Sequence, residues 1–504
     1  MRTLINRMKI GLLIFGTASL VAGQPLQAQD EVPSLLSLEE ALEIAQANNP
    51  GYRQVRNDIQ LADWGVRQAY GSLLPSANAS GGTSWQGAGE QQFGSLTLGD
   101  LGFLNQPSYY FSNYFVGLNY SLDWATLRAP SLAKADRRVI EAQIGLAGSD
   151  LEANVTSAYV EALRQQEALR VSELQLENSQ FNLRLAEGQL EVGTVTAIDV
   201  GQAEVQVGRS QVTVLQSRNA LETARMRILQ QLGLQMGSAF ELSTDFTLSP
   251  PIWNVEDLRM MALSQNPNLE TRRRSRESAE INVSSARSSY FPSLSISTGL
   301  SGFARQASNT DFQVAQAEAR IAGSMAQCLS TNDLYSRLAT PLPPLNCSQF
   351  VFTDVQRQSI TDSNDQFPFG FQRSPPSVQL QMSIPIFQGL SRQRNVEAAR
   401  LQRDDLLEQI REQEIALEAD ISIGLANVRT AYESALLEER NRELADQQLR
   451  LARERYQLGE ITFVDLVAAQ TVLAQAEADQ IAAVFAYHDL VTTLESLVGT
   501  SLRN

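Results

Sequence analysis

The feature that most constrains the fold of this chain is an internal duplication. Residues 37–50 resemble residues 254–267, which lie 217 positions later. Farther along the chain the offset becomes 266, as in the pair Gly193 and Gly459. Neither matched block needs a gap, so the second copy carries 49 additional residues between positions 299 and 417. Self-similarity over such distances indicates a duplicated structural unit.

The duplication divides the chain into two predicted repeats. We expect a first repeat at residues 29–235, a linker at 236–253 and a second repeat at 254–504. Residues 1–28 have the pattern of a secretory signal peptide: basic residues, an apolar run at 10–21 and small residues before the cut. A membrane helix needs about 20 apolar residues, so an N-terminal anchor is the less favoured alternative.

Composition excludes several classes of function. The 504 residues include one histidine and two cysteines, too few for the common zinc sites or a histidine-based catalytic triad. The formal net charge of −16 argues against nucleic-acid binding, which needs clustered Lys and Arg. We therefore expect no enzyme, no cofactor and no metal. No later stretch of 18 apolar residues lacks a charge and no cysteine follows the cut. We thus expect neither a transmembrane helix nor a lipoprotein anchor.

Each copy begins with two short helices. Ser37 followed by Glu40 is a capping-box pattern, and Asn254 precedes acidic residues that suit the first turn of a helix. The repeated Asn-Pro pairs, ending at Pro50 and Pro267, predict that a second helix starts there, with Asn as the cap and Pro at the first helical position. These second helices are expected to end near residues 75 and 292.

Alternating apolar and polar residues then predict a strand pair in each copy, at 76–125 and 293–387. One face of the return strands collects the apolar residues Tyr114, Val116, Leu118, Tyr120, Leu122, Trp124, Val378, Leu380, Met382, Ile384 and Ile386. Such strands suit either a half-buried soluble sheet or a membrane barrel with a wet lumen. Four strands cannot close a useful barrel, so in a membrane several protomers must share it. The aromatic residues at 109–115 fit an interfacial girdle, with core packing as the alternative.

Long helical hairpins follow the strands, at 130–235 and 392–499. Apolar residues recur at steps of three and four, which favours coiled-coil packing over rods of roughly 90 Å. The first helix of each hairpin ends at a glycine turn, Gly193-Thr194 in copy one and Gly459-Glu460 in copy two.

The additional residues of copy two form a predicted long loop at about 303–375. It is rich in Asn, Asp, Gln, Ser and Pro, and it contains both cysteines, Cys328 and Cys347. In an exported protein this pair is most simply a disulfide, and two free thiols are the alternative.

Taken in order, these features resemble the TolC-like outer-membrane efflux proteins over residues 37–499. The motifs that carry the resemblance are Leu38-Glu-Glu-Ala-Leu42, Asn48-Asn-Pro50, Leu73-Leu-Pro75, Ile384-Pro-Ile-Phe-Gln-Gly389, Arg455-Tyr-Gln-Leu-Gly459, Val464-Asp-Leu466 and Ala469-Gln470. The resemblance implies a mainly α-helical homotrimer, in which each protomer gives four strands to a twelve-stranded transmembrane β-barrel. It also implies a periplasmic α-helical barrel whose tip, at Gly193, Thr194, Gly459 and Glu460, meets an adaptor protein of an inner-membrane pump.

The resemblance also implies gate residues near the tip. Asp465 matches one aspartate of a ring that holds the family's pore closed, and Tyr456 with Asp199 match a hydrogen-bonded pair. Ala468 replaces the second ring aspartate and Ile461 replaces a locking arginine, so the gate is expected to be weaker or built differently. Read from the residues alone, Asp199 and Asp465 equally suit acids at a helix N-terminus.

The resulting expectation is a passive exit channel in the outer membrane of a Gram-negative-type cell, serving a tripartite efflux or type I secretion system. Its expected partners are two further copies of the chain, the adaptor, the pump and outer-membrane lipid. The acidic net charge predicts a lumen that favours cations. The alternative is a soluble periplasmic coiled-coil adaptor or spacer.

Overall fold

The computed structural model describes residues 34–503, apart from 90–91, 94–95, 98–105, 236–239 and 245–246. The expected signal peptide, 1–28, lies outside the described residues, as does part of the linker at 236–253. The chain divides into two compact units. The hairpin unit comprises the described parts of 1–57, 143–269 and 413–504, and the sheet unit comprises those of 58–142 and 270–412. Each unit takes segments from both copies, so the boundaries of the two repeats stay a prediction about the duplicated sequence.

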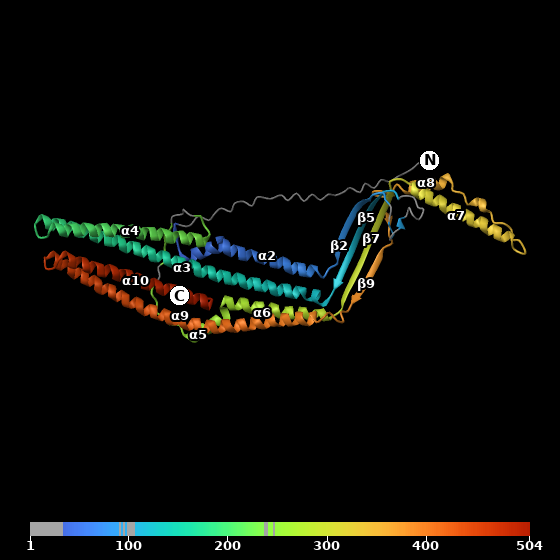
Figure 1. Ribbon diagram of the computed structural model, residues 1–504. Coiled ribbons are helices and arrows are strands. Elements are labelled where there is room, and N and C mark those ends of the chain that lie inside the picture. Colours follow the sequence, from blue (N-terminus) through green and yellow to red (C-terminus); the bar gives the residue numbers. More distant parts are fainter. Residues whose placement is uncertain are drawn as a thin grey trace, which may run out of the picture. The chain divides into compact units, whose positions relative to one another are not determined.

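The two copies have the same order of main elements (Figure 1). Copy one contains α1 (Leu38–Asn48), α2 (Pro50–Gly71), β2 (Ser76–Gln86), β5 (Tyr109–Leu122), α3 (Trp124–Glu191) and α4 (Ala197–Leu232). Copy two contains α5 (Val255–Gln265), α6 (Pro267–Ala286), β7 (Ser293–Ala307), β9 (Ser377–Ser383), α9 (Ser391–Gln457) and α10 (Phe463–Val498). The chain also contains several short elements: β1 (Leu35–Leu36), β3 (Gln92–Phe93), β4 (Leu96–Thr97), β6 (Glu241–Leu242) and the 3₁₀ turns η1 (Arg287–Tyr290) and η2 (Cys347–Gln349).

The expected helix starts are present. The Glu40 backbone N–H donates to Ser37 Oγ at 3.2 Å, and the Ser37 N–H donates to the Glu40 carboxylate at 2.9 Å, which completes the capping box. Asn254 caps α5. Asn49 Oδ1 accepts from the N–H of Tyr52, and Asn266 Oδ1 accepts from that of Leu269.

The same two asparagines also fasten the far end of each long hairpin. Asn49 Nδ2 donates to the carbonyl of Gln231 at 2.7 Å, and Asn266 Nδ2 donates to that of Leu497 at 2.8 Å. Both α4 and α10 then end at a glycine with positive φ, Gly233 and Gly499. A Cβ at Gly233 would lie 2.5 Å from the Asn48 carbonyl oxygen, and one at Gly499 would lie 2.5 Å from that of Gln265. We call this paired contact the asparagine–glycine latch.

Buried side chains of the hairpin unit form three clusters. In copy one, α1, α3 and α4 enclose a core that includes Tyr159 and Ile228. In copy two, α5, α9 and α10 enclose the equivalent core, which includes Ile421 and Leu494. The third cluster lies near the glycine turns and contains residues of both hairpins, among them Ala186, Ala203, Leu449, Tyr456, Phe463, Leu466 and Ala469.

One described helix, α10, is long and apolar enough to cross a membrane by length and composition alone. Its buried residues belong to two of these clusters, Phe463 and Leu466 to the one near the turns and Val491 and Leu494 to the copy-two core. A third of its most apolar 18-residue window is buried, so packing against neighbouring helices accounts for part of the hydropathy of α10.

The sheet unit contains an antiparallel sheet in the order β2-β5-β7-β9, with β8 (Gln372–Arg373) also paired with β7. Its register aligns Ala79 with Val116 and Val116 with Leu300. One side of the sheet, the apolar face, carries Ala77, Ala79, Val116, Leu118, Leu122, Leu294, Ile296, Leu300, Val378, Leu380 and Met382. The other, the polar face, carries Asn78, Ser80, Asn119, Ser121, Ser293, Ser295, Ser297, Gln379 and Gln381.

Two expectations about strand ends are wrong. Trp124 is the first residue of α3, because Asp123 Oδ1 accepts hydrogen bonds from the Thr126 N–H at 2.7 Å and Thr126 Oγ1 at 2.9 Å and so caps the helix. Ile384 and Ile386 follow the end of β9 at Ser383. Pro385 lacks an N–H for the sheet, and its carbonyl accepts from Arg392 Nη1 at 2.9 Å instead.

The segment expected as a loop at 303–375 is largely structured. Strand β7 continues to Ala307, and α7 (Asp311–Ser336) and α8 (Asp354–Ser363) follow it (Figure 1). Cys328 in α7 and Cys347 are joined by a disulfide across a sequence separation of 19. The additional residues of copy two are thus a helical insertion at the end of the strands.

Candidate functional site

The two glycine turns have the same backbone geometry. In copy one, Gly193 has φ 76°, its N–H donates to the Leu190 carbonyl at 3.0 Å, and the Thr194 N–H donates to that of Gln189 at 2.9 Å. In copy two, Gly459 has φ 74°, and the N–H groups of Gly459 and Glu460 reach the carbonyls of Tyr456 and Arg455 at 3.0 and 2.9 Å. Both are Schellman motifs, which require a residue that tolerates the left-handed conformation.

A capping box begins the helix after each turn. The Asp199 carboxylate accepts from the N–H and the hydroxyl of Thr196 at 2.8 and 2.7 Å. The Asp465 carboxylate accepts from the same groups of Thr462 at 3.0 and 2.7 Å. The hydrogen bonds from Thr196, the backbone one first, lower the pKa of Asp199, and those from Thr462, the hydroxyl first, lower the pKa of Asp465. Both aspartates are therefore ionised at neutral pH and stabilise a helix start.

Tyr456 lies in the cluster shared by both hairpins. Its side chain is 3% exposed, and its ring is tilted against Phe463 with centroids 5.9 Å apart. Its hydroxyl finds no hydrogen-bond partner among the described residues. Burial raises the pKa of Tyr456, and the negative charge of Asp199 raises it further. The structure thus brings Tyr456 and Asp199 into electrostatic range, while the Asp199 carboxylate bonds to Thr196.

The two substituted gate positions differ in environment. Ile461 is partly buried and packs against the shared cluster. Ala468 is exposed on α10. Neither side chain can donate or accept a hydrogen bond, so the contacts at the turns come from the capping boxes, the apolar cluster and the ion pair of Arg455 with Glu460 at 3.3 Å.

The turns also expose apolar side chains that the sequence motifs do not include. Val192 and Leu458, each just before the turn glycine, are both 74% exposed. Ile198 and Val464, each just before the capping aspartate, are 72% and 59% exposed. The sequence could have revealed them: Val192 and Leu458 are 266 residues apart, and so are Ile198 and Val464, which is the offset that separates the two turn glycines.

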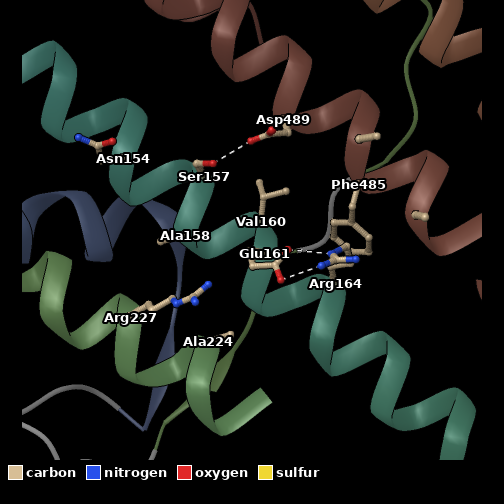
Figure 2. Close-up of a pocket in the computed structure, with 12 residues that line it drawn as sticks. Asn154, Ser157, Ala158, Val160, Glu161, Arg164, Ala224, Arg227, Phe485 and Asp489 are labelled. Carbon is tan, nitrogen blue, oxygen red and sulfur yellow. Dashed lines mark hydrogen bonds and ion pairs between the residues drawn. The ribbon is translucent and has the colours of Figure 1, made fainter. Parts of the chain in front are cut away.

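A cavity of about 480 Å³ lies elsewhere in the hairpin unit, between α3, α4 and α10 (Figure 2). Glu161 binds Arg164 through two hydrogen bonds at 2.7 and 2.8 Å, and Ser157 donates to Asp489 at 2.8 Å. The hydrogen bond from Arg164 lowers the pKa of Glu161, and the positive charge of Arg227 in α4 lowers it further. Glu161 is thus paired within α3, and the hydrogen bond from Ser157 to Asp489 ties α3 to α10.

The chain has recognisable relatives. A family model described as "Outer membrane efflux protein" matches residues 41–234 and 339–500. The probable outer membrane lipoprotein SilC of Salmonella typhimurium is 23% identical over 159 residues, which cover 32% of this chain and 34% of that protein. That match therefore spans about a third of the relative's length.

Solved structures share the fold along almost the whole chain. The outer-membrane channel OprN matches with a TM-score of 0.65 and 17% identity, covering 94% of both chains. The CmeC outer membrane channel of Campylobacter jejuni matches with a TM-score of 0.67 and 14% identity, covering 93% of this chain and 87% of that one. The fold class expected from the sequence, a mainly α-helical chain with four long strands in one sheet and two long helical hairpins, is confirmed. The family match takes in most of both copies, and the chain belongs to the outer membrane efflux protein family.

Proposed function

We propose that this protein is the outer-membrane exit channel of a tripartite efflux or type I secretion system. The observation that carries the proposal is the two-sided sheet. Its apolar face exposes Val116, Leu118, Val378 and Leu380, each between 48% and 75% exposed. Water would oppose that exposure in a soluble adaptor, whereas hydrocarbon favours it. The channel reading is thus preferred to the soluble alternative.

The sheet edges support assembly from several copies. Within the described residues, β2 pairs only with β5, and the long edge at β9 pairs only with β7. Unpaired backbone groups cannot remain in a bilayer, so each edge needs a further strand. Three copies that pool four strands each close a twelve-stranded ring with the polar face inside, which is a passive conduit and performs no covalent chemistry.

The glycine turns are the proposed periplasmic tip. Gly193, Thr194, Gly459 and Glu460 are exposed there, beside the apolar side chains of Val192 and Leu458. Exposed apolar groups on rigid turns suit docking to a partner protein, here the adaptor of an inner-membrane pump. The pump supplies the driving force, and Asp199, Tyr456 and Asp465 form part of the gate that the adaptor releases.

Extraction behaviour tests the channel itself. The protein should require detergent for release and should run as a heat-modifiable trimer. Release by osmotic shock as a monomer would reject both the trimer and the membrane location.

The gate proposal is tested by comparing Asp465→Ala with Thr462→Ala. Both substitutions break the same capping box, so both weaken the start of α10 to a similar extent. If Asp465 also holds the pore closed, only Asp465→Ala raises single-channel conductance or antibiotic leakage through the outer membrane. Equal leakage in the two variants would reduce Asp465 to a helix cap.

The tip proposal is tested with Gly193→Ala and Gly459→Ala, and with Gly188→Ala as the matched control. Gly188 lies one turn earlier in α3, with helical backbone and open space around it. The two turn variants should impair efflux while trimers remain intact, and the control should pump normally. Normal efflux in both turn variants would exclude the turns as the docking point.

A further inference from the structure

Charge is almost absent from the five-stranded sheet. In its described strands, β2, β5, β7, β8 and β9, the only charged side chains are Arg305 and Arg373. The remaining polar positions are Ser, Thr, Asn, Gln and Tyr. Any electrostatic preference of this wall therefore depends on two arginines.

The register places the two arginines on opposite faces. Arg305 pairs with Phe111. It lies four and eight residues after Ser301 and Ser297, so it shares the polar face of β7 with them. Arg373 pairs with Gly302, which lies two residues after Leu300 and therefore on the same apolar face. In an antiparallel pair, directly opposed residues point to the same side of the sheet. Arg305 therefore belongs to the polar face and Arg373 to the apolar one.

Aromatic rings hold Arg305 in place. Its guanidinium carbon lies 3.8 Å from the centre of the Tyr109 ring and 5.7 Å from that of Phe111. Tyr109 is 4% exposed, so the ring on which the guanidinium lies is itself fixed. Stacking of this kind stabilises a cation without neutralising it.

The strand end that carries Arg305 is also fastened. Asn364, just after α8, accepts from the Ala307 N–H and donates to the Ala307 carbonyl, both at 2.8 Å. Within the described residues no carboxylate lies within ion-pair distance of Arg305, and the side chain is exposed. The positive charge is thus fixed in position and unpaired within that part of the chain.

We propose that Arg305 determines the ion selectivity of the barrel, by placing a ring of three positive charges on the lumen wall at the strand ends that carry the insertion. The inference rests on the proposed trimeric channel. Fixed charges on an otherwise uncharged wall attract counter-ions and repel ions of like charge. This section of the pore therefore favours anionic solutes, opposite to the cation preference predicted from the net charge of −16.

Reversal potentials of purified trimers in planar bilayers, measured under a potassium chloride gradient, test the proposal. The variants are Arg305→Gln, Arg305→Lys and the matched control Arg373→Gln, which removes the same charge from the apolar face. Measurements are made at about 0.01 M salt, where the screening length is about 30 Å, and at about 1 M, where it is about 3 Å.

Arg305→Gln should lower the ratio of chloride to potassium permeability several-fold at low salt and change it little at high salt. Arg305→Lys should keep most of the wild-type ratio, and Arg373→Gln should match the wild type. An unchanged ratio in Arg305→Gln, or an equal shift in Arg373→Gln, would overturn the role of Arg305 while leaving the channel intact. A wild-type protein that forms no conducting trimer would instead overturn the proposed function, and this inference with it.

Discussion

The two copies of the repeat are alike at the glycine turns and different at the far end of their strands. At the turns, both have a glycine with positive φ, a Schellman motif and a Thr-Asp capping box that ends six residues on. At the strand ends, residues 87–108 connect β2 to β5, whereas residues 308–376 connect β7 to β9 and include two helices and a disulfide.

The difference follows from what each end requires. A turn between two long helices needs a residue that accepts φ near 75° and groups that satisfy the free helix ends, which leaves few solutions. A connection beyond the end of a strand pair has no such geometry to meet, and loop-closure entropy rises only slowly with its length. Substitutions at equivalent positions of the two turns, or of the two latch contacts, should thus have similar effects on stability. Substitutions in the insertion should leave the rest of the protein unaffected.

The largest effect is expected where a latch glycine is compared with a turn glycine. Gly233→Ala puts a methyl group 2.5 Å from the Asn48 carbonyl oxygen at φ 73°, whereas Gly193→Ala meets no atom within 4 Å at φ 76°. The first should destabilise the protein by about 2–5 kcal/mol and the second by about 1–2 kcal/mol, because overlap adds to the left-handed backbone penalty. Denaturant midpoints of the purified trimer measure both. Gly499→Ala should behave like Gly233→Ala, and equal midpoints for Gly233→Ala and Gly193→Ala would contradict the latch.

The disulfide should act on the insertion alone. Changing both Cys328 and Cys347 to Ser releases a chain constraint of 19 residues, worth about 3 kcal/mol to the local stability of the insertion. Limited proteolysis should then cut within 311–363 faster, with trimer dissociation unchanged. A lower dissociation midpoint would show that the insertion stabilises the whole assembly, and the comparison would fail.

A smaller loss of stability is expected when either latch asparagine is replaced. Asn266→Ala and Asn49→Ala each remove a helix cap and a hydrogen bond to the end of a long helix, about 1–2 kcal/mol. Asn266 is only 6% exposed, so its loss should be the larger of the two. Denaturant midpoints again provide the measurement. If one substitution lowered the free energy of unfolding at least twice as much as the other, the two latch contacts would differ in strength despite their similar geometry.

The smallest effect concerns pH at the capping boxes. Hydrogen bonds lower the pKa values of Asp199 and Asp465, so the stabilisation is present above the unfolded-state pKa of about 3.9 and is lost as pH falls through the lower folded-state pKa. Asp199→Asn and Asp465→Asn should speed amide exchange in the first turns of α4 and α10 at neutral pH. The difference from wild type should disappear well below pH of about 4. If the variants still exchanged faster than wild type in acid, the charge of the aspartates would not be the cause of the faster exchange.

Local chemistry made much of the fold predictable. Ser37, the Asn-Pro pairs and the turn glycines each favour one local backbone geometry, so the caps and turns could be placed from sequence. Other features depend on neighbours that sequence does not show. Alternation continues past Asp123 to Trp124, and only the cap formed by Asp123 ends the strand. In the insertion, abundant polar residues obscured α7, although its alanines favour a helix.

The candidate site was less predictable for the same reason. Asp199 and Asp465 fit two roles from sequence, and the structure shows the capping contacts while the gate remains a proposal. The stacking of Arg305 on Tyr109 depends on the pairing of β5 with β7, and no local pattern specifies which residues of two distant strands meet.

The latch has a mechanical consequence for the hairpins. At Gly233 and Gly499 the backbone is in contact with the neighbouring chain segment, whereas open space surrounds Gly193 and Gly459. At its base each hairpin is thus held by a direct backbone contact at the glycine, whereas near its tip it is held by the shared apolar cluster. A turn glycine can therefore shift without pushing on a neighbouring segment, while a shift of a latch glycine must also move the segment that it touches.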